Sequence, residues 1–129
     1  MKLMARIVLL LSAFMATAAI AKTDIWSVKS TFLNVREQAT TSSPILYKIV
    51  KHFPLEVVGK KGVWRQVKDF EGDTGWVHSD YLSTAKTAIV TNEFANIRAS
   101  ATISSEKVGK ADYGDVFPVL SVKDKWVEI

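Results

Sequence analysis

Eight aromatic side chains stand between residues 22 and 84. Six of them are candidates for a binding surface or for the core: Trp26, Tyr47, Trp64, Phe70, Trp76 and Tyr81. In a domain of this size Trp and Tyr rings are seldom wholly buried, and an exposed ring can stack on a sugar face or a peptide. We expect Tyr47, Trp64 and Tyr81 to line a binding surface, with burial in the core as the alternative. We expect Trp76 to pack in the core.

Arg36 is the charged residue that we add to this candidate site. An arginine also stands 62 positions later, as Arg98. The planar guanidinium can bind a carboxylate, such as that of a peptide stem, or it can pin its own loop by hydrogen bonds to backbone carbonyls. The sequence leaves both roles open. The candidate ligand-binding residues are therefore Arg36, Tyr47, Trp64 and Tyr81.

The sequence holds no recognisable catalytic constellation. It has no cysteine, and its two histidines, His52 and His78, do not form a His-Glu-x-x-His motif. No Gly-x-Ser-x-Gly elbow is present. Three acidic residues within positions 69–73 lack the spacing of a calcium loop, so we expect a solvated hairpin turn there. We predict no catalytic residues, no metal site and no cofactor.

The residue pattern repeats once, at an offset of 62 residues without a gap. Of the 41 paired positions that end at residue 129, 12 are identical. The motif Phe-x-Asn-x-Arg at residues 32–36 recurs at residues 94–98, and Trp64 recurs as Trp126. A fixed internal period indicates two related modules. Because the second copy has no counterpart of residues 68–83, we expect it to be incomplete.

Residues 1–21 have the pattern of a secretory signal peptide. Lys2 and Arg6 give a basic start, an apolar run follows, and Ala19-Ile20-Ala21 offers a small-x-small cleavage site. The apolar run is shorter than the ~20 residues of a membrane-spanning helix. We expect cleavage after Ala21 and export to the periplasm or the extracellular space, without stable membrane insertion afterwards. The alternative is an uncleaved membrane anchor.

The charge of the mature chain argues against a nucleic-acid partner. Without residues 1–21 the chain has 15 basic and 13 acidic side chains, a net charge of +2 against +4 for the whole sequence. No segment concentrates Lys and Arg in the way that a nucleic-acid-binding surface does.

The elements that must position the candidate site are β-strands. Short runs rich in Val, Ile, Trp and Phe alternate with Gly, Asp, Ser and Pro, and no window of 11 or more residues has a helical period. The expected strands are residues 25–29, 32–36, 46–50, 55–59, 64–68, 74–78 and 79–82, followed by 89–91, 116–122 and 126–129.

The opening Asn34-Val35-Arg36 and the closing Gly75-Trp76-Val77-His78 stand about 40 residues apart, with Trp64 between them. In this combination the chain resembles the bacterial SH3-like family, and in particular its exported members with tandem SH3-like regions. The resemblance implies an all-β fold, with a small five-stranded SH3-like barrel over residues 22–84 and a partial second barrel over residues 85–129. It also implies that the module binds a ligand, since several members of the family bind peptidoglycan or its peptides.

We therefore expect an exported, non-catalytic binding module that contacts cell-wall peptidoglycan or its peptide stems. The alternative is a protein–protein interaction scaffold of the bacterial envelope with no wall ligand. In either case the strand edge left open in the second repeat invites pairing, either with the first repeat or with a second copy of the chain in a homodimer.

Overall fold

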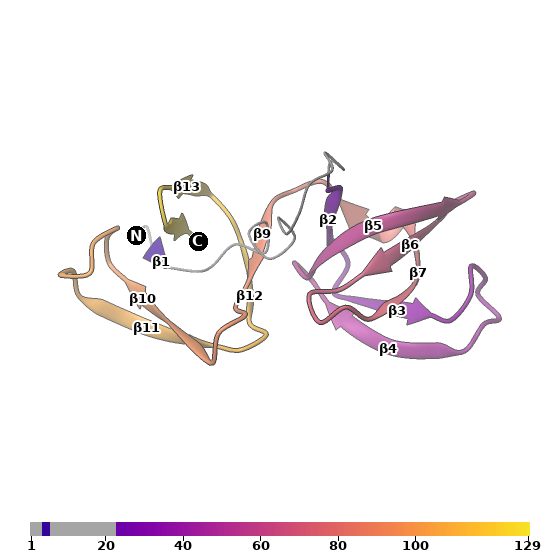
Figure 1. The fold of residues 1–129 in the computed structure, drawn as a ribbon, viewed down its shortest axis with the longest axis horizontal. Helices are drawn as coiled ribbons and strands as arrows, with labels where there is room; N and C mark the ends of the chain where they lie inside the picture. Colours follow the sequence, from indigo (N-terminus) through magenta and orange to yellow (C-terminus); the bar gives the residue numbers. More distant parts are fainter. Residues whose placement is uncertain (1–3, 6–22) are drawn as a thin grey trace. The chain divides into compact units, whose positions relative to one another are not determined.

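The computed structural model describes residues 4–5 and 23–129, and these fall into two compact units. The first unit comprises residues 23–86, and the second comprises residues 87–129 together with residues 4–5. Within the described residues every regular element is a β-strand except one short 3₁₀ turn (Figure 1). The all-β class expected from the sequence is confirmed.

The first unit folds as one antiparallel sheet of seven strands in the order β4-β3-β7-β6-β5-β2-β8 (Figure 1). Its elements are β2 (Ile25–Val28), β3 (Phe32–Arg36), β4 (Ile45–Val50), β5 (Pro54–Lys61), β6 (Trp64–Lys68), β7 (Thr74–His78), the 3₁₀ turn η2 (Ser79–Tyr81) and β8 (Leu82–Ser83). The resemblance implied five strands. The sheet has seven because β2 pairs with β5, and the two-residue β8 pairs with β2.

Strand alternation builds the core of the first unit. Leu33 and Val35 of β3 are buried, while the residues on either side of them are not, because successive side chains of a strand point to opposite faces. Strands from the whole unit contribute to the same cluster. Its buried members are Val28, Leu33, Val35, Ile49, Leu55, Val67, Val77 and Leu82.

Trp76 does not join this core, so our expectation for it is wrong. Its strand β7 buries Gly75 and Val77, which places Trp76 between them on the opposite face. There it is half-buried, and its backbone pairs with Arg36 of β3 and Gln66 of β6.

The second unit carries a five-stranded sheet in the order β11-β10-β1-β14-β13 and a separate strand pair, β12-β9 (Figure 1). Its elements are β1 (Met4–Ala5), β9 (Thr87–Ile89), β10 (Phe94–Arg98), β11 (Lys107–Asp112), β12 (Val116–Pro118), β13 (Ser121–Lys123) and β14 (Trp126–Glu128). The pair β10–β11 has the register of β3–β4 at an offset of 62 residues, with the same irregularity just before the arginine. Its core is smaller, because Leu33 and Ile49 of the first core correspond to Ala95 and Ala111.

Strand β1 occupies the place in the second sheet that β7 occupies in the first. β7 lies between β3 and β6, where Trp76 pairs with Arg36 and with Gln66. β1 lies between β10 and β14, where Met4 pairs with Arg98 and Glu128. These two residues stand 62 positions after Arg36 and Gln66, the partners of Trp76. Residues 4–5 therefore take the register of residues 76–77.

We expected residues 1–21 to lie outside the fold, and the open edge of the second repeat to pair with the first repeat or with another chain. Residues 4–5 pair with that edge instead. The physical reason is that β10 and β14 would otherwise leave backbone N–H and C=O groups unpaired along two facing edges. Residues 1–3 and 6–21 lie outside the described residues, so cleavage after Ala21 and a homodimer stay predictions.

Removal of residues 1–21 should open the sheet of the second unit. In a chain of residues 22–129 we expect the amides of β10 and β14 to exchange with deuterium about fivefold faster or more, since each lost hydrogen bond is worth about 1 kcal/mol. The amides of β3 and β6 are the control and should keep their rates. Unchanged protection of β10 and β14 would contradict the pairing role of β1.

Gly75 allows β7 to approach β3 closely. A Cβ atom at this position would overlap Cγ1 of Val35 and would lie 3.1 Å from the backbone oxygen of Arg36. That oxygen cannot move aside easily, because β3 is held by β4 on one side and by β7 on the other.

The substitution Gly75→Ala should therefore destabilise the first unit by about 1–3 kcal/mol, the usual range for overpacking. Gly59→Ala is the matched control, because the nearest atom to a Cβ there, at 2.9 Å, is Oε1 of Gln66, the end of a flexible side chain. Urea denaturation of both variants checks the difference, and equal losses of stability would show that the rigid contact at Gly75 is not the cause.

Candidate functional site

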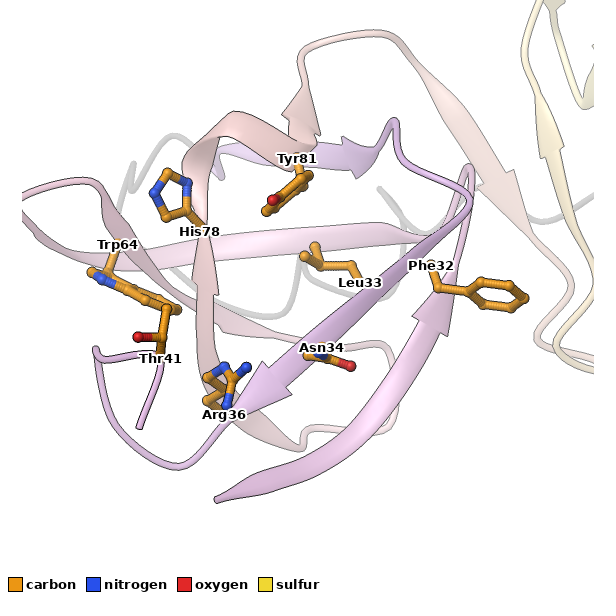
Figure 2. Close-up of a pocket in the computed structure, with 8 residues that line it drawn as sticks. All are labelled: Phe32, Leu33, Asn34, Arg36, Thr41, Trp64, His78 and Tyr81. Atoms are coloured by element: carbon orange, nitrogen blue, oxygen red, sulfur yellow. The ribbon is translucent and has the colours of Figure 1, made fainter. Parts of the chain in front are cut away.

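A cavity of about 340 Å³ opens on the surface of the first unit, and we refer to it as the first groove. Its lining residues are Phe32, Leu33, Asn34, Arg36, Thr41, Trp64, His78 and Tyr81 (Figure 2). Strand β3 supplies four of them, and the others come from the loop after β3, from β6, from β7 and from η2. The groove therefore exists only because the sheet brings these separate segments together.

Three rings form the aromatic wall of the groove. The ring centroids of Trp64 and His78 are 5.5 Å apart, and those of His78 and Tyr81 are 5.8 Å apart, both in edge-to-face contact. Trp64 and His78 are direct cross-strand partners in β6 and β7, and η2 follows β7 at once and carries Tyr81. Tyr81 is 49% exposed, so part of its surface remains accessible to a ligand.

The backbone of the turn after β7 determines which ring nitrogen of a neutral His78 carries the proton. The amide N–H of Asp80 donates to Nδ1 of His78 at 3.1 Å. In a neutral imidazole, a nitrogen that accepts a hydrogen bond leaves the proton on the other nitrogen. In this form His78 offers an N–H donor at Nε2 rather than a free base.

Arg36 holds the loop between β3 and β4. Its Nη1 donates to the carbonyl oxygen of Ser43 at 2.8 Å, and the amide of Gln38 donates to Oγ of Ser43 at 2.8 Å. Thr41, which lines the groove, lies in this loop. The loop-pinning role that the sequence left open is thus present. A guanidinium has five N–H donors, so pinning the loop does not exhaust its capacity to bind a ligand.

The structure brings three of the four predicted binding residues, Arg36, Trp64 and Tyr81, into the first groove, and it places Tyr47 elsewhere. The Tyr47 ring packs against the hydrophobic core, and its hydroxyl donates to Oδ2 of Asp69 at 3.1 Å. In this position Tyr47 joins β4 to the turn between β6 and β7.

That turn is organised by Asp69, which is 6% exposed. Its Oδ1 accepts hydrogen bonds from the amides of Glu71 and Asp73, each at 2.9 Å. The acidic cluster is thus a hairpin turn whose first carboxylate is engaged by backbone N–H groups and by Tyr47. Within residues 4–5 and 23–129, no group of three or more His, Cys, Asp or Glu side chains is placed to hold a metal ion.

Several lining residues were not among the predicted site residues. Phe32 and Asn34 carried a usable signal, because the Phe-x-Asn-x-Arg motif recurs at residues 94–98. Thr41 carried none of this kind, since its counterpart is Ile103. His78 falls in an expected strand, residues 74–78, and only its pairing with Trp64 across two strands reveals its place in the wall.

Comparison with known proteins agrees with this geometry. Residues 31–83 match the family model of the bacterial SH3 domain, a segment that contains every lining residue of the first groove. The chain thus carries a bacterial SH3 domain, and the family expected from its opening and closing motifs is confirmed for this segment. The tandem arrangement stays a prediction.

The chain is also similar to the putative N-acetylmuramoyl-L-alanine amidase YrvJ of Bacillus subtilis (strain 168). The two are 30% identical over 113 residues, which cover 75% of this chain and 22% of the relative. The similarity therefore extends beyond residues 31–83, while the chain spans only about a fifth of the relative's length. No helix in the described part of the chain is both long and apolar enough to cross a bilayer.

The contact between Tyr47 and Asp69 should make the stability of the first unit depend on pH in the alkaline range. Burial, together with the charge and hydrogen bond of Asp69, raises the pKa of Tyr47 far above its usual value. The unfolded chain loses this proton near pH ~10 and the folded chain retains it, so the free energy of unfolding should fall as the pH rises above about 10. Urea denaturation at pH 9 and pH 11 should show a smaller fall for Tyr47→Phe than for the wild type. Tyr81→Phe is the control and should keep the wild-type slope; a Tyr47→Phe profile parallel to the wild type would contradict the linkage.

Proposed function

We propose that this protein is an exported, non-catalytic binding module whose first groove contacts cell-wall peptidoglycan or its peptide stems. The observation that carries the proposal is the composition of the groove, in which an aromatic wall faces polar groups of strand β3 (Figure 2). The wall is formed by Trp64, His78 and Tyr81, and the polar groups are Asn34 and Arg36.

Each part of the groove suits one part of such a ligand. The C–H face of a sugar ring, or an apolar stretch of a peptide stem, can stack on Trp64 and Tyr81. The amide of Asn34 can pair with an acetamido group or a peptide bond, because it both donates and accepts. The guanidinium of Arg36 can bind the carboxylate of a stem peptide.

The comparisons support the same class of ligand. Residues 31–83 form a bacterial SH3 domain, and the similar protein from Bacillus subtilis bears the name of an enzyme that acts on N-acetylmuramoyl-L-alanine. That linkage joins a sugar to a peptide, the two components of the proposed ligand. A location in the cell envelope or outside the cell follows from this ligand, and the basic start and apolar run of residues 1–21 agree with it. Cleavage after Ala21 would also remove β1 from the exported chain.

The groove favours binding over catalysis. His78, the one imidazole in its lining, accepts the Asp80 amide at Nδ1, and in its neutral form it presents a donor instead of a base.

Sedimentation with purified, protein-free sacculi tests the proposal. We expect the wild type to sediment with the sacculi and Trp64→Ala to lose about fivefold or more in apparent affinity, since Trp is enriched among the interface residues whose truncation costs more than about 1 kcal/mol. Trp76→Ala is the matched control, because Trp76 is also half-buried but lies outside the groove lining. Tyr81→Ala is a second groove variant with less risk to the fold, since Tyr81 is half exposed.

Circular dichroism of each variant separates loss of the groove from loss of the fold. Equal affinities of Trp64→Ala and Trp76→Ala would place the ligand outside the first groove. If the folded wild type fails to sediment, the wall ligand is wrong and the interaction-scaffold alternative is favoured. Release of soluble wall fragments by the protein alone would overturn the non-catalytic part of the proposal.

A further inference from the structure

The second unit has a hollow of its own, of about 220 Å³, which we refer to as the second groove. It is lined by Phe94, Ala95, Asn96, Arg98, Ile103 and Trp126. Each of these residues stands 62 positions after a lining residue of the first groove. Phe, Asn, Arg and Trp are the same in both grooves, so the second groove keeps the amide, the guanidinium and the indole of the first.

The backbone that positions these groups is also the same. Nη1 of Arg98 donates to the carbonyl oxygen of Ser105 at 2.9 Å, as Arg36 does to Ser43. The amide of Ser100 donates to Oγ of Ser105 at 3.3 Å, which corresponds to the bond from Gln38 to Ser43. Because the loop is held by the same hydrogen bonds, Asn96 and Arg98 present their polar groups from an equivalent frame.

Three differences make the second groove smaller and leave it without part of the aromatic wall. It has no counterparts of His78 and Tyr81, because the strand in the place of β7 is the two-residue β1. Thr41 is replaced by Ile103, whose side chain is 70% exposed at the rim. Leu33 is replaced by Ala95. The shared groups indicate the same class of ligand, and the missing rings indicate weaker binding.

A second cation lies beside this groove. The ammonium group of Lys110 is 4.8 Å from the ring centroid of Phe94, and it is also 3.6 Å from a carboxylate oxygen of Asp112. Arg98 and Lys110 together give this side of the second unit two basic groups near the lining. Because Asp112 offsets the charge of Lys110, the guanidinium of Arg98 is the group in the lining that favours a ligand with a carboxylate.

We propose that the second groove is a second, weaker binding site for the same ligand class, so that one chain holds two units of a repeating polymer that carries acetamido and carboxylate groups. The inference rests on the proposed function of the first groove. Two weak sites on one chain raise the apparent affinity for a polymer by about 10²–10⁴ when both can engage, and they give no such gain with a single repeating unit.

Comparison of a polymer with its fragment tests this inference in the whole chain. The probes are intact sacculi and the monomeric disaccharide-peptide released from them by a muramidase. We expect Trp126→Ala to lower the apparent affinity for sacculi by about tenfold or more, and to change the affinity for the monomeric fragment less than twofold. Leu120→Ala is the matched control, because Leu120 is 65% exposed in the second unit and lies outside the groove lining.

A second variant avoids dependence on the fold of the second unit. Ile103→Asp changes an exposed loop position and adds a negative charge that repels a carboxylate, so it should weaken binding to sacculi as Trp126→Ala does. Amide chemical shifts of Asn96 and Arg98 should also move when the fragment is added at high concentration.

The outcomes distinguish this inference from the proposed function. If Trp64→Ala abolishes binding to sacculi while Trp126→Ala and Ile103→Asp behave as Leu120→Ala, the first groove stands and the second is overturned. Equal losses for sacculi and fragment would also overturn the bivalent inference, because they would place both residues in one site. Failure of the folded wild type to bind sacculi would overturn both.

Discussion

Strand β7 is hydrogen-bonded to β3 on one side and to β6 on the other, and the first groove depends on this double pairing. Two strands that face each other across a gap one strand wide both need backbone partners. β7 supplies these partners, and in doing so it sets His78 opposite Trp64 and leads directly to η2 and Tyr81. Gly75 permits the close approach to β3. The strand that completes the sheet therefore also builds the aromatic wall.

The same requirement accounts for the unusual strand of the second unit. β10 and β14 leave an equivalent gap, and residues 4–5 enter it in the register that residues 76–77 have in the first sheet. Pairing of this kind uses only backbone groups, which almost every residue possesses, so a short segment of unrelated sequence can satisfy it. Such a segment does not supply the rings that follow Trp76 in β7 and η2. The second groove therefore keeps Asn96, Arg98 and Trp126 while lacking counterparts of His78 and Tyr81.

The recurrence of the Asn-x-Arg motif has a structural explanation as well as the role in binding proposed above. In each unit the arginine donates to a serine carbonyl seven positions later, and this bond holds the loop at the end of the groove. A loop held in this way positions the neighbouring asparagine and the groove rim. The motif thus maintains a frame common to both units, while His78 and Tyr81, which occur in the first unit alone, distinguish the ligand surfaces.

The sequence by itself determined the all-β class, the bacterial SH3 family of residues 31–83 and three of the proposed groove residues. Alternating apolar and polar positions, as in residues 32–36, define a half-buried strand whatever its neighbours are, and Arg36, Trp64 and Tyr81 are chemically suited to an exposed site. The tertiary structure decided that Trp76 faces outward and that Tyr47 bonds to Asp69, because a shift of one residue in register turns a side chain to the other face of the sheet. It also decided the pairing of Met4 with Arg98, since contacts between distant backbone groups leave no pattern of side chains in the sequence.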